Sequence, residues 1–159
     1  MGVQQFNYMT TKLKKLNRKK VKSKTVKPKR TKVICVSHQE DADGISSAAL
    51  IKQAFGGETI LADYPGMMDR LESLRNDEKL KKLFICDLGL NTQTNDSFVN
   101  LLTELRKKRI SVTYVDHHDI NPKIITKLKK IKVKLIHNTS ECASVLVYDT
   151  FKKKLSEHS

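Results

Sequence analysis

The chain has 159 residues, a mass of 18.2 kDa and a formal net charge of +14, which predicts one compact domain. Three cysteines without a Cys-x-x-Cys pair argue against a disulfide framework or a zinc finger. Because no apolar run is long enough for a membrane span or a secretion signal, we expect a cytoplasmic protein with no membrane partner.

The excess positive charge is concentrated at the N-terminus. Residues 1–32 contain 12 of the 31 Lys and Arg residues and no acid, which leaves 19 bases against 17 acids in residues 33–159. We predict a flexible basic tail over 1–32 and a folded domain over 33–159. Such a tail is attracted to nucleic acid by counterion release, although it could also be a solvated extension without a binding role.

Short apolar runs alternate with segments of helical periodicity from residue 31 onward. The runs predict strands over 33–36, 59–62, 83–86, 110–115 and 133–136. The periodic segments predict helices over 45–54, 67–74, 97–105, 123–130 and 140–155. This alternation predicts a three-layer α/β fold, in which helices cover both faces of a central, mainly parallel sheet of about five strands.

Carboxylates and imidazoles follow three of the predicted strands. The first strand runs into His38, Asp41 and Asp43, the third ends at Asp87, and the fourth ends in the sequence Asp-His-His at 116–118. Since the carboxyl ends of parallel strands meet at one edge of the sheet, we expect these side chains to converge there. Oxygen and imidazole ligands suit Mn²⁺, Mg²⁺, Fe²⁺ or Zn²⁺.

Each of these residues also has an ordinary structural interpretation. Asp41 could cap a helix, Asp87 could accept hydrogen bonds from loop amides, and His117 and His118 could be simple loop residues. Taken together they favour a metal site, because carboxylates gathered at one edge repel each other unless a cation neutralises them.

Four stretches of the sequence resemble the DHH phosphoesterases, in the order found in that family. They are VSHQEDADGISSAAL, FICDLG, VDHHD and TSECASVLVY, which together span residues 36–148. The family includes RecJ-like single-strand exonucleases, oligoribonucleases, cyclic-dinucleotide phosphodiesterases and manganese-dependent inorganic pyrophosphatases.

The resemblance implies a site for two divalent metal ions, with Mn²⁺ as the first choice and Mg²⁺ as the alternative. It implies that Asp41, Asp43 and His117 are ligands and that Asp87 bridges the two ions. His38 is a further candidate ligand, although its spacing from the paired Asp residues varies among branches of the family.

The resemblance also implies roles for residues beside the ions. His118 would face the scissile phosphate, and Asp116 would orient a histidine. Ser140 and Ser144 lie at the start of the last predicted helix, where open amides could hold the substrate anion. We expect Cys142 to be a small buried residue.

The function implied is metal-dependent hydrolysis of phosphodiesters in single-stranded nucleic acid or short oligonucleotides. Family members continue into a further metal motif and a smaller C-terminal substrate domain, which nothing in 149–159 resembles. We therefore expect a fragment, or a short protein that depends on a partner chain. The alternatives are a non-catalytic scaffold in DNA replication or repair, and a phosphoesterase for oligoribonucleotides, cyclic dinucleotides or pyrophosphate.

Overall fold

The computed structural model describes residues 31–157, so nearly all of the basic tail predicted over 1–32 lies outside the described residues. The strands are β1 (Lys32–His38), β2 (Glu58–Ala62), β3 (Leu80–Cys86), β4 (Ser111–Asp116) and β5 (Lys134–His137). The helices are α2 (Ala42–Phe55), α3 (Met67–Glu72), α4 (Asn95–Lys107), α5 (Pro122–Lys130) and α6 (Ala143–Ser156).

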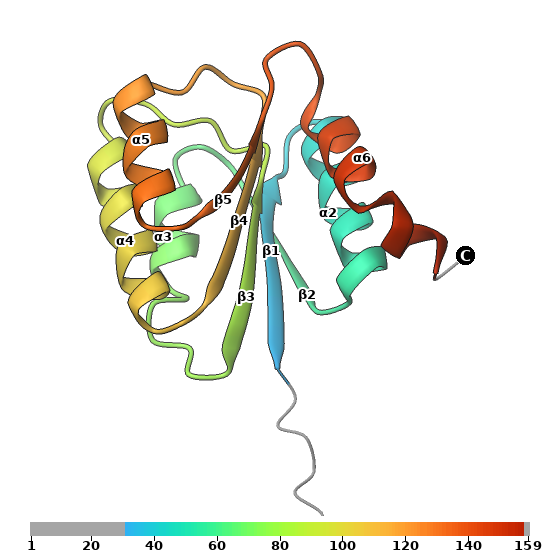
Figure 1. The fold of residues 1–159 in the computed structure, drawn as a ribbon, viewed down its shortest axis with the longest axis horizontal. Helices are drawn as coiled ribbons and strands as arrows, with labels where there is room; N and C mark the ends of the chain where they lie inside the picture. The colour runs from blue at the N-terminus through green and yellow to red at the C-terminus, as the bar shows by residue number, and fades with distance from the viewer. Residues whose placement is uncertain (1–30, 158–159) are drawn as a thin grey trace, which may run out of the picture.

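All five strands are parallel and lie in the order β2-β1-β3-β4-β5. Helices α3, α4 and α5 cover one face of the sheet, and α2 and α6 cover the other (Figure 1). The prediction of a three-layer α/β fold around a parallel sheet is therefore confirmed.

The core lies on both faces of the sheet. In β1, Ile34 and Val36 join the larger apolar cluster under α3, α4 and α5, whereas Cys35 between them joins the smaller cluster under α2 and α6. In β3, Phe84 likewise packs toward α2 and α6. Because both faces are covered, the central strands read as nearly continuous apolar runs rather than as an alternating pattern.

The strand order places a topological switch point between β1 and β3. The chain leaves β1 through α2 on one face and leaves β3 through α4 on the other face (Figure 1). The two connections therefore diverge above the carboxyl ends of β1 and β3, which is where ligands bind in open α/β sheets.

Helices α2 and α6 begin three residues away from their predicted starts, whereas α4 and α5 begin two residues and one residue earlier than predicted. Helix α2 begins at Ala42 rather than at residue 45, because Asp41 adopts extended backbone angles and its side chain accepts a hydrogen bond from the amide of Gly44. Helix α6 begins at Ala143 rather than at residue 140, because the Ser140 amide donates to Asn138 Oδ1 in a preceding turn. No helix within residues 31–157 is both long and apolar enough to cross a membrane.

Candidate metal centre

Asp87 is the buried carboxylate at the centre of the candidate site. It follows β3 directly, has a left-handed backbone with a φ of 55°, and is 0% exposed. Neither carboxylate oxygen has a hydrogen-bond partner among the described residues. Burial, followed by repulsion from Asp43 and Asp41, raises the pKa of Asp87 to about 6. A buried carboxylate without hydrogen bonds is costly to keep charged, so a cation bound beside it would stabilise the charged form.

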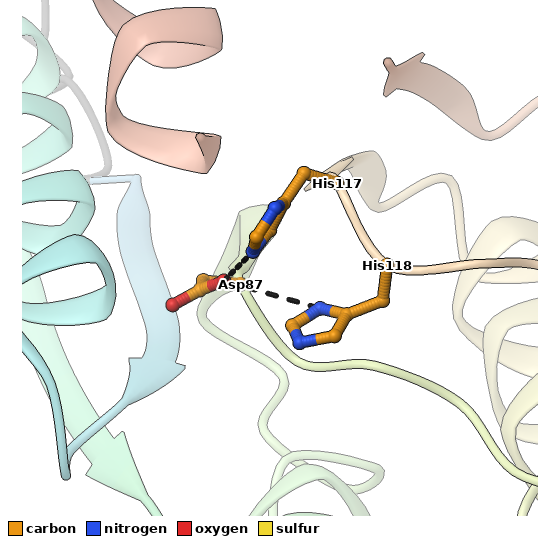
Figure 2. A group of neighbouring side chains, drawn as sticks. All are labelled: Asp87, His117 and His118. Atoms are coloured by element: carbon orange, nitrogen blue, oxygen red, sulfur yellow. Dashed lines mark ion pairs between the residues drawn. The ribbon is translucent and has the colours of Figure 1, made fainter. Parts of the chain in front are cut away.

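Two histidines approach Asp87 from the loop after β4 (Figure 2). His117 Nε2 lies 3.3 Å from Asp87 Oδ1, and His118 Nδ1 lies 4.0 Å from the same oxygen. The three side chains offer ligand atoms that all lie within 4.8 Å of one another. One cation could therefore contact atoms from the ends of both β3 and β4.

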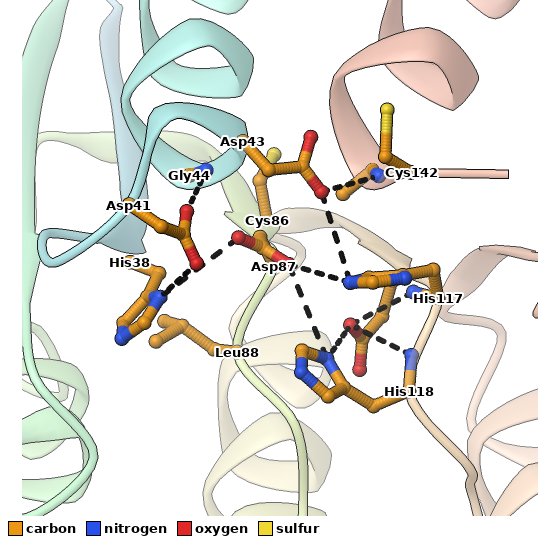
Figure 3. Close-up of polar contacts among 12 residues, drawn as sticks. His38, Asp41, Asp43, Gly44, Cys86, Asp87, Leu88, His117, His118 and Cys142 are labelled. Atoms are coloured by element: carbon orange, nitrogen blue, oxygen red, sulfur yellow. Dashed lines mark hydrogen bonds and ion pairs between the residues drawn. The ribbon is translucent and has the colours of Figure 1, made fainter.

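His38 and Asp41 approach Asp87 from the other side, where β1 leads into α2 (Figure 3). His38 Nδ1 lies 3.0 Å from Asp41 Oδ2 and 3.9 Å from Asp87 Oδ2. His38 Nε2 is buried without a hydrogen-bond partner in the described part of the chain. The amide of Gly44 donates to Asp41 Oδ1 and is the main reason that the pKa of Asp41 is lowered.

These contacts define two groups of potential ligands, and Asp87 belongs to both. One group is Asp87 with His117 and His118, and the other is Asp87 with His38 and Asp41. Hard carboxylate oxygens and imidazole nitrogens, together with the unpartnered oxygens of Asp87, fit two divalent cations on either side of this carboxylate.

Asp43 lies beside these groups but makes different contacts. Its carboxylate accepts hydrogen bonds from the amides of Ala143 at 2.8 Å and Ser144 at 2.7 Å, so it caps the N-terminus of α6. Its Oδ2 also lies 3.7 Å from His117 Nε2. Burial alone would raise the pKa of Asp43, but the hydrogen bonds from Ser144 and Ala143 outweigh it and the pKa is lowered. A ligand role for Asp43 remains a prediction.

Asp116 is hydrogen-bonded to His118, and its expected role in orienting a histidine stays a prediction. Asp116 Oδ1 lies 2.8 Å from His118 Nδ1 and also accepts from the His117 amide. The hydroxyl of Tyr114 lies 2.6 Å from Asp116 Oδ2. Burial alone would raise the pKa of Asp116, but hydrogen bonds from His118 and Tyr114 keep it lowered. The hydrogen bond to Asp116 in turn raises the pKa of His118.

The start of α6 differs from what the sequence analysis expects. The amides of Ala143 and Ser144 are not open to an anion, because Asp43 occupies both. The Ser140 side chain is exposed and that of Ser144 is half-buried, so their contacts with substrate remain predictions. The prediction that Cys142 is buried is wrong, because Ala143 and Val147 occupy the packed face of α6 and leave Cys142 exposed at the cap position.

The sequence analysis missed Tyr64 and His137. The Tyr64 hydroxyl lies 3.0 Å from His118 Nε2, and its ring centroid lies 4.8 Å from that of His38. His137 Nε2 donates to the carbonyl oxygen of His118 at 2.7 Å and so fixes the loop that carries it. Both residues lie at the carboxyl ends of β2 and β5, so the rule that located the other candidates could have found them.

Two glycines leave room for the imidazoles. A Cβ added at Gly44 would lie 2.4 Å from the carbonyl oxygen of His38, and one at Gly89 would lie 2.9 Å from Cγ of His118. At Gly44 so short a contact would require the backbone to shift, and at Gly89 it would require the His118 side chain or the backbone to shift. The glycines of the DADG and DLG stretches therefore allow the two histidines to approach the site.

Comparisons with known proteins bear on the family and the fold. The sequence pattern described as "DHH family, N-terminal domain" matches residues 32–159. A solved structure of an uncharacterized protein from Helicobacter pylori G27 is 23% identical, with a TM-score of 0.61 over 77% of this chain and 37% of that chain. This chain thus spans just over a third of the length of that protein.

Two further solved structures are more distant. A putative pilus assembly-related protein from Burkholderia pseudomallei K96243 is 14% identical, with a TM-score of 0.46 over 82% of this chain and 93% of that chain. A CheY-like protein, tadZ, from Pseudomonas aeruginosa PAO1 is 12% identical, with a TM-score of 0.44 over 79% of this chain and 94% of that chain. A search of curated proteins finds no significant match.

Proposed function

The chain belongs to the DHH family of phosphoesterases, and on that premise we propose that it hydrolyses phosphodiesters with the help of two divalent metal ions. The observation that carries this proposal is Asp87, a fully buried carboxylate without hydrogen bonds that lies between two groups of potential ligands. A residue with only a structural role would have its oxygens satisfied by neighbouring amides.

The ligand side chains divide into two sets around Asp87. His38 and Asp41 would hold one ion, and His117 would hold the other, with Asp43 close enough to His117 to contribute. Mn²⁺ is the first choice, because it accepts both carboxylate oxygen and imidazole nitrogen, and Mg²⁺ is the alternative. When bound, such a pair of ions lowers the pKa of a water and stabilises charge on the phosphoryl oxygens.

His118 is the proposed proton donor to the leaving oxygen. Asp116 holds its Nδ1 at 2.8 Å and raises its pKa, so the second ring nitrogen can carry a proton close to neutral pH. That nitrogen, Nε2, lies 3.0 Å from the hydroxyl of Tyr64, a contact that would hold the ring in its present orientation. In the proposed reaction, this chain therefore positions a proton and also binds the metal ions.

We propose a single-stranded nucleic acid or a short oligonucleotide as the substrate. The 12 cations of residues 1–32 can contact many successive phosphates of a polymer, whereas pyrophosphate or a cyclic dinucleotide offers few. Because the similar Helicobacter pylori protein is much longer than the matched region, we also propose that another chain segment or a partner chain supplies part of the substrate contact. A cytoplasmic location is consistent with this substrate.

The test is hydrolysis of a short single-stranded oligonucleotide by the full chain with Mn²⁺, together with the metal content of the protein. We expect the Asp87→Asn variant to lose at least about 100-fold in rate, since one removed ligand affects both ions. The Asp149→Asn variant, which makes the same change at an exposed position on α6, is the matched control and should retain activity.

Two results would contradict the proposal. Undiminished hydrolysis by Asp87→Asn would show that the reaction does not use this site. A wild-type chain that binds no divalent metal and hydrolyses nothing would favour the non-catalytic scaffold. Metal binding that depends on Asp87, with turnover only after a partner is added, would support the partner-dependent form of the proposal.

A further inference from the structure

Six exposed cations lie at the end of the molecule opposite the candidate metal centre. Helices α4 and α5 run antiparallel to the strands, so they end at the edge where the strands begin (Figure 1). The candidate metal centre lies at the other edge, where the strands end. We call this set the basic edge, and it consists of Lys107, Lys108, Arg109, Lys129, Lys130 and Lys132.

A partly buried contact joins the two halves of the basic edge. Arg106 Nη1 donates to the carbonyl oxygen of Ile110 at 2.7 Å, and its Nε donates to that of Ile131 at 3.4 Å. The turn after α4 and the turn after α5 are therefore held side by side. The three cations at the end of each helix therefore lie on neighbouring turns.

Among the described residues, nearby acids offset the charge of the basic edge only at Lys108. This side chain lines a pocket with Asp77 and Glu78, and its Nζ donates to the carbonyl oxygen of Arg75 at 2.6 Å. The sequence contains no Asp or Glu in 105–115 or in 120–140. Within residues 31–157, no carboxylate lies within ion-pair distance of any of the six cations, whereas the neighbouring Lys127 pairs with Asp96 at 2.9 Å. This surface therefore presents positive charge to solvent.

Two of the six cations occupy positions where glycine is preferred. Arg109 has a φ of 62° and Lys132 a φ of 60°, and each follows the end of a helix. The next residue in each case, Ile110 or Val133, closes the helix with a hydrogen bond to a carbonyl five residues earlier. The helix dipole favours cations in the last turn, but it does not require one at a strained left-handed position.

We propose that the basic edge binds the sugar-phosphate backbone of nucleic acid, at a distance from the metal centre. The proposal extends the nucleic-acid part of the proposed function and rests on it for the choice of partner. A membrane surface fits less well, because the apolar residues of α5, such as Ile124 and Leu128, are buried and no apolar face accompanies the cations. Strand β1 also begins at this edge, so the cation-rich residues 1–32 connect to the domain there.

The test is the salt dependence of binding of the full chain, without metal, to a labelled oligothymidylate of about 30 nucleotides. The main variant is Arg109→Gly/Lys132→Gly, which removes two charges without adding backbone strain. A second variant, Lys129→Gln/Lys130→Gln, removes two charges without changing the turns. The matched control is Arg70→Gln/Lys52→Gln, which removes two exposed cations from α3 and α2.

We expect both basic-edge variants to bind more weakly at low salt. The slope of log K against log salt should become shallower by about 0.7 for each cation, or about 1.4 for each double variant. The control should keep the wild-type slope. Because this assay uses no metal, absence of hydrolysis in the activity assay would leave its result unaffected.

Equal slopes for the wild type and both basic-edge variants would overturn the proposal, as would a control that changes as much as they do. A second assay measures binding of the same variants to vesicles of phosphatidylserine and phosphatidylcholine. If the basic-edge variants lose binding to the vesicles but bind the oligonucleotide as the wild type does, the surface recognises lipid and the proposal is wrong.

Discussion

At the scale of single residues, the proposed chemistry depends on Asp87, which among the described residues combines burial, a left-handed backbone and two oxygens without hydrogen bonds. Its pKa of about 6 in the folded, metal-free chain lies above the 3.8 of an ordinary Asp. The folded state therefore binds this proton more tightly than the unfolded state does. The free energy of unfolding of the metal-free chain should therefore fall as the pH rises from about 4 to about 6. It should stay lower above that range.

We predict that Asp87→Asn makes the metal-free chain more stable at about pH 8, by roughly 1–3 kcal/mol, because the buried charge is gone and Asn tolerates a positive φ. At about pH 4 the two proteins should be nearly equal, since wild-type Asp87 is then protonated. The variant should also lose the increase in melting temperature that Mn²⁺ gives the wild type. Thermal unfolding with and without Mn²⁺ at both pH values measures these effects, and a destabilised variant at pH 8 would contradict the interpretation.

A second prediction concerns Tyr64, because His118 Nε2 contacts the Tyr64 hydroxyl. We expect Tyr64→Phe to lower kcat about tenfold with little change in KM, since the ring is kept and only the orientation of His118 is affected. Tyr148→Phe, on the exposed surface of α6, is the matched control. A change in KM alone would assign Tyr64 to substrate binding instead.

At the scale of secondary-structure elements, the first turn of helix α6 is capped by a carboxylate from another helix. Its cap residue, Cys142, makes no side-chain capping bond, and Asp43 on α2 accepts from two amides in the first turn. We expect Asp43→Ala to lower the free energy of unfolding by about 1–2 kcal/mol, the usual effect of losing a cap. Chemical denaturation in EDTA measures this loss without a contribution from metal. A stability unchanged in EDTA would show that the cap contributes nothing.

Substitutions at the ends of α4 and α5 are expected to raise the free energy of unfolding. Glycine at positions 109 and 132 relieves two left-handed backbones, at the expense of two cations near helix C-termini. We expect Arg109→Gly/Lys132→Gly to be more stable than the wild type by about 1 kcal/mol while it binds nucleic acid more weakly. Thermal unfolding at high salt checks the first part, and a lower melting temperature would show that these side chains stabilise the fold.

Much of this fold could be predicted from the sequence, because the five apolar runs and the helical segments between them alternate clearly. Some of the contacts that hold the helices in place could not, because they join residues that are distant in the sequence. Asp43 caps a helix that begins 100 residues later in the chain, and no local pattern indicates that pairing. Tyr64 and His137 were missed for a different reason, since neither belongs to a stretch that resembles the family, although both follow strands.

The molecule as a whole places the candidate metal centre and the basic edge at opposite ends of the sheet. The carboxylates of Asp41, Asp43, Asp87 and Asp116 lie at the edge where the strands end, and the basic edge lies where the strands begin. A divalent cation and a polyanion are thus attracted to different ends of one small domain. A single strand held at the basic edge would have to pass around the domain, or reach the centre of a second copy, to be hydrolysed.

The Asp87 carboxylate is proposed to be shared by two ligand groups, which together form one site for two divalent ions. Anomalous diffraction from crystals of the full chain grown with Mn²⁺ tests this proposal most directly. We expect two manganese peaks, both within bonding distance of the Asp87 carboxylate, one beside His38 and Asp41 and the other beside His117. Manganese bound only elsewhere, or none at Asp87, would contradict the account.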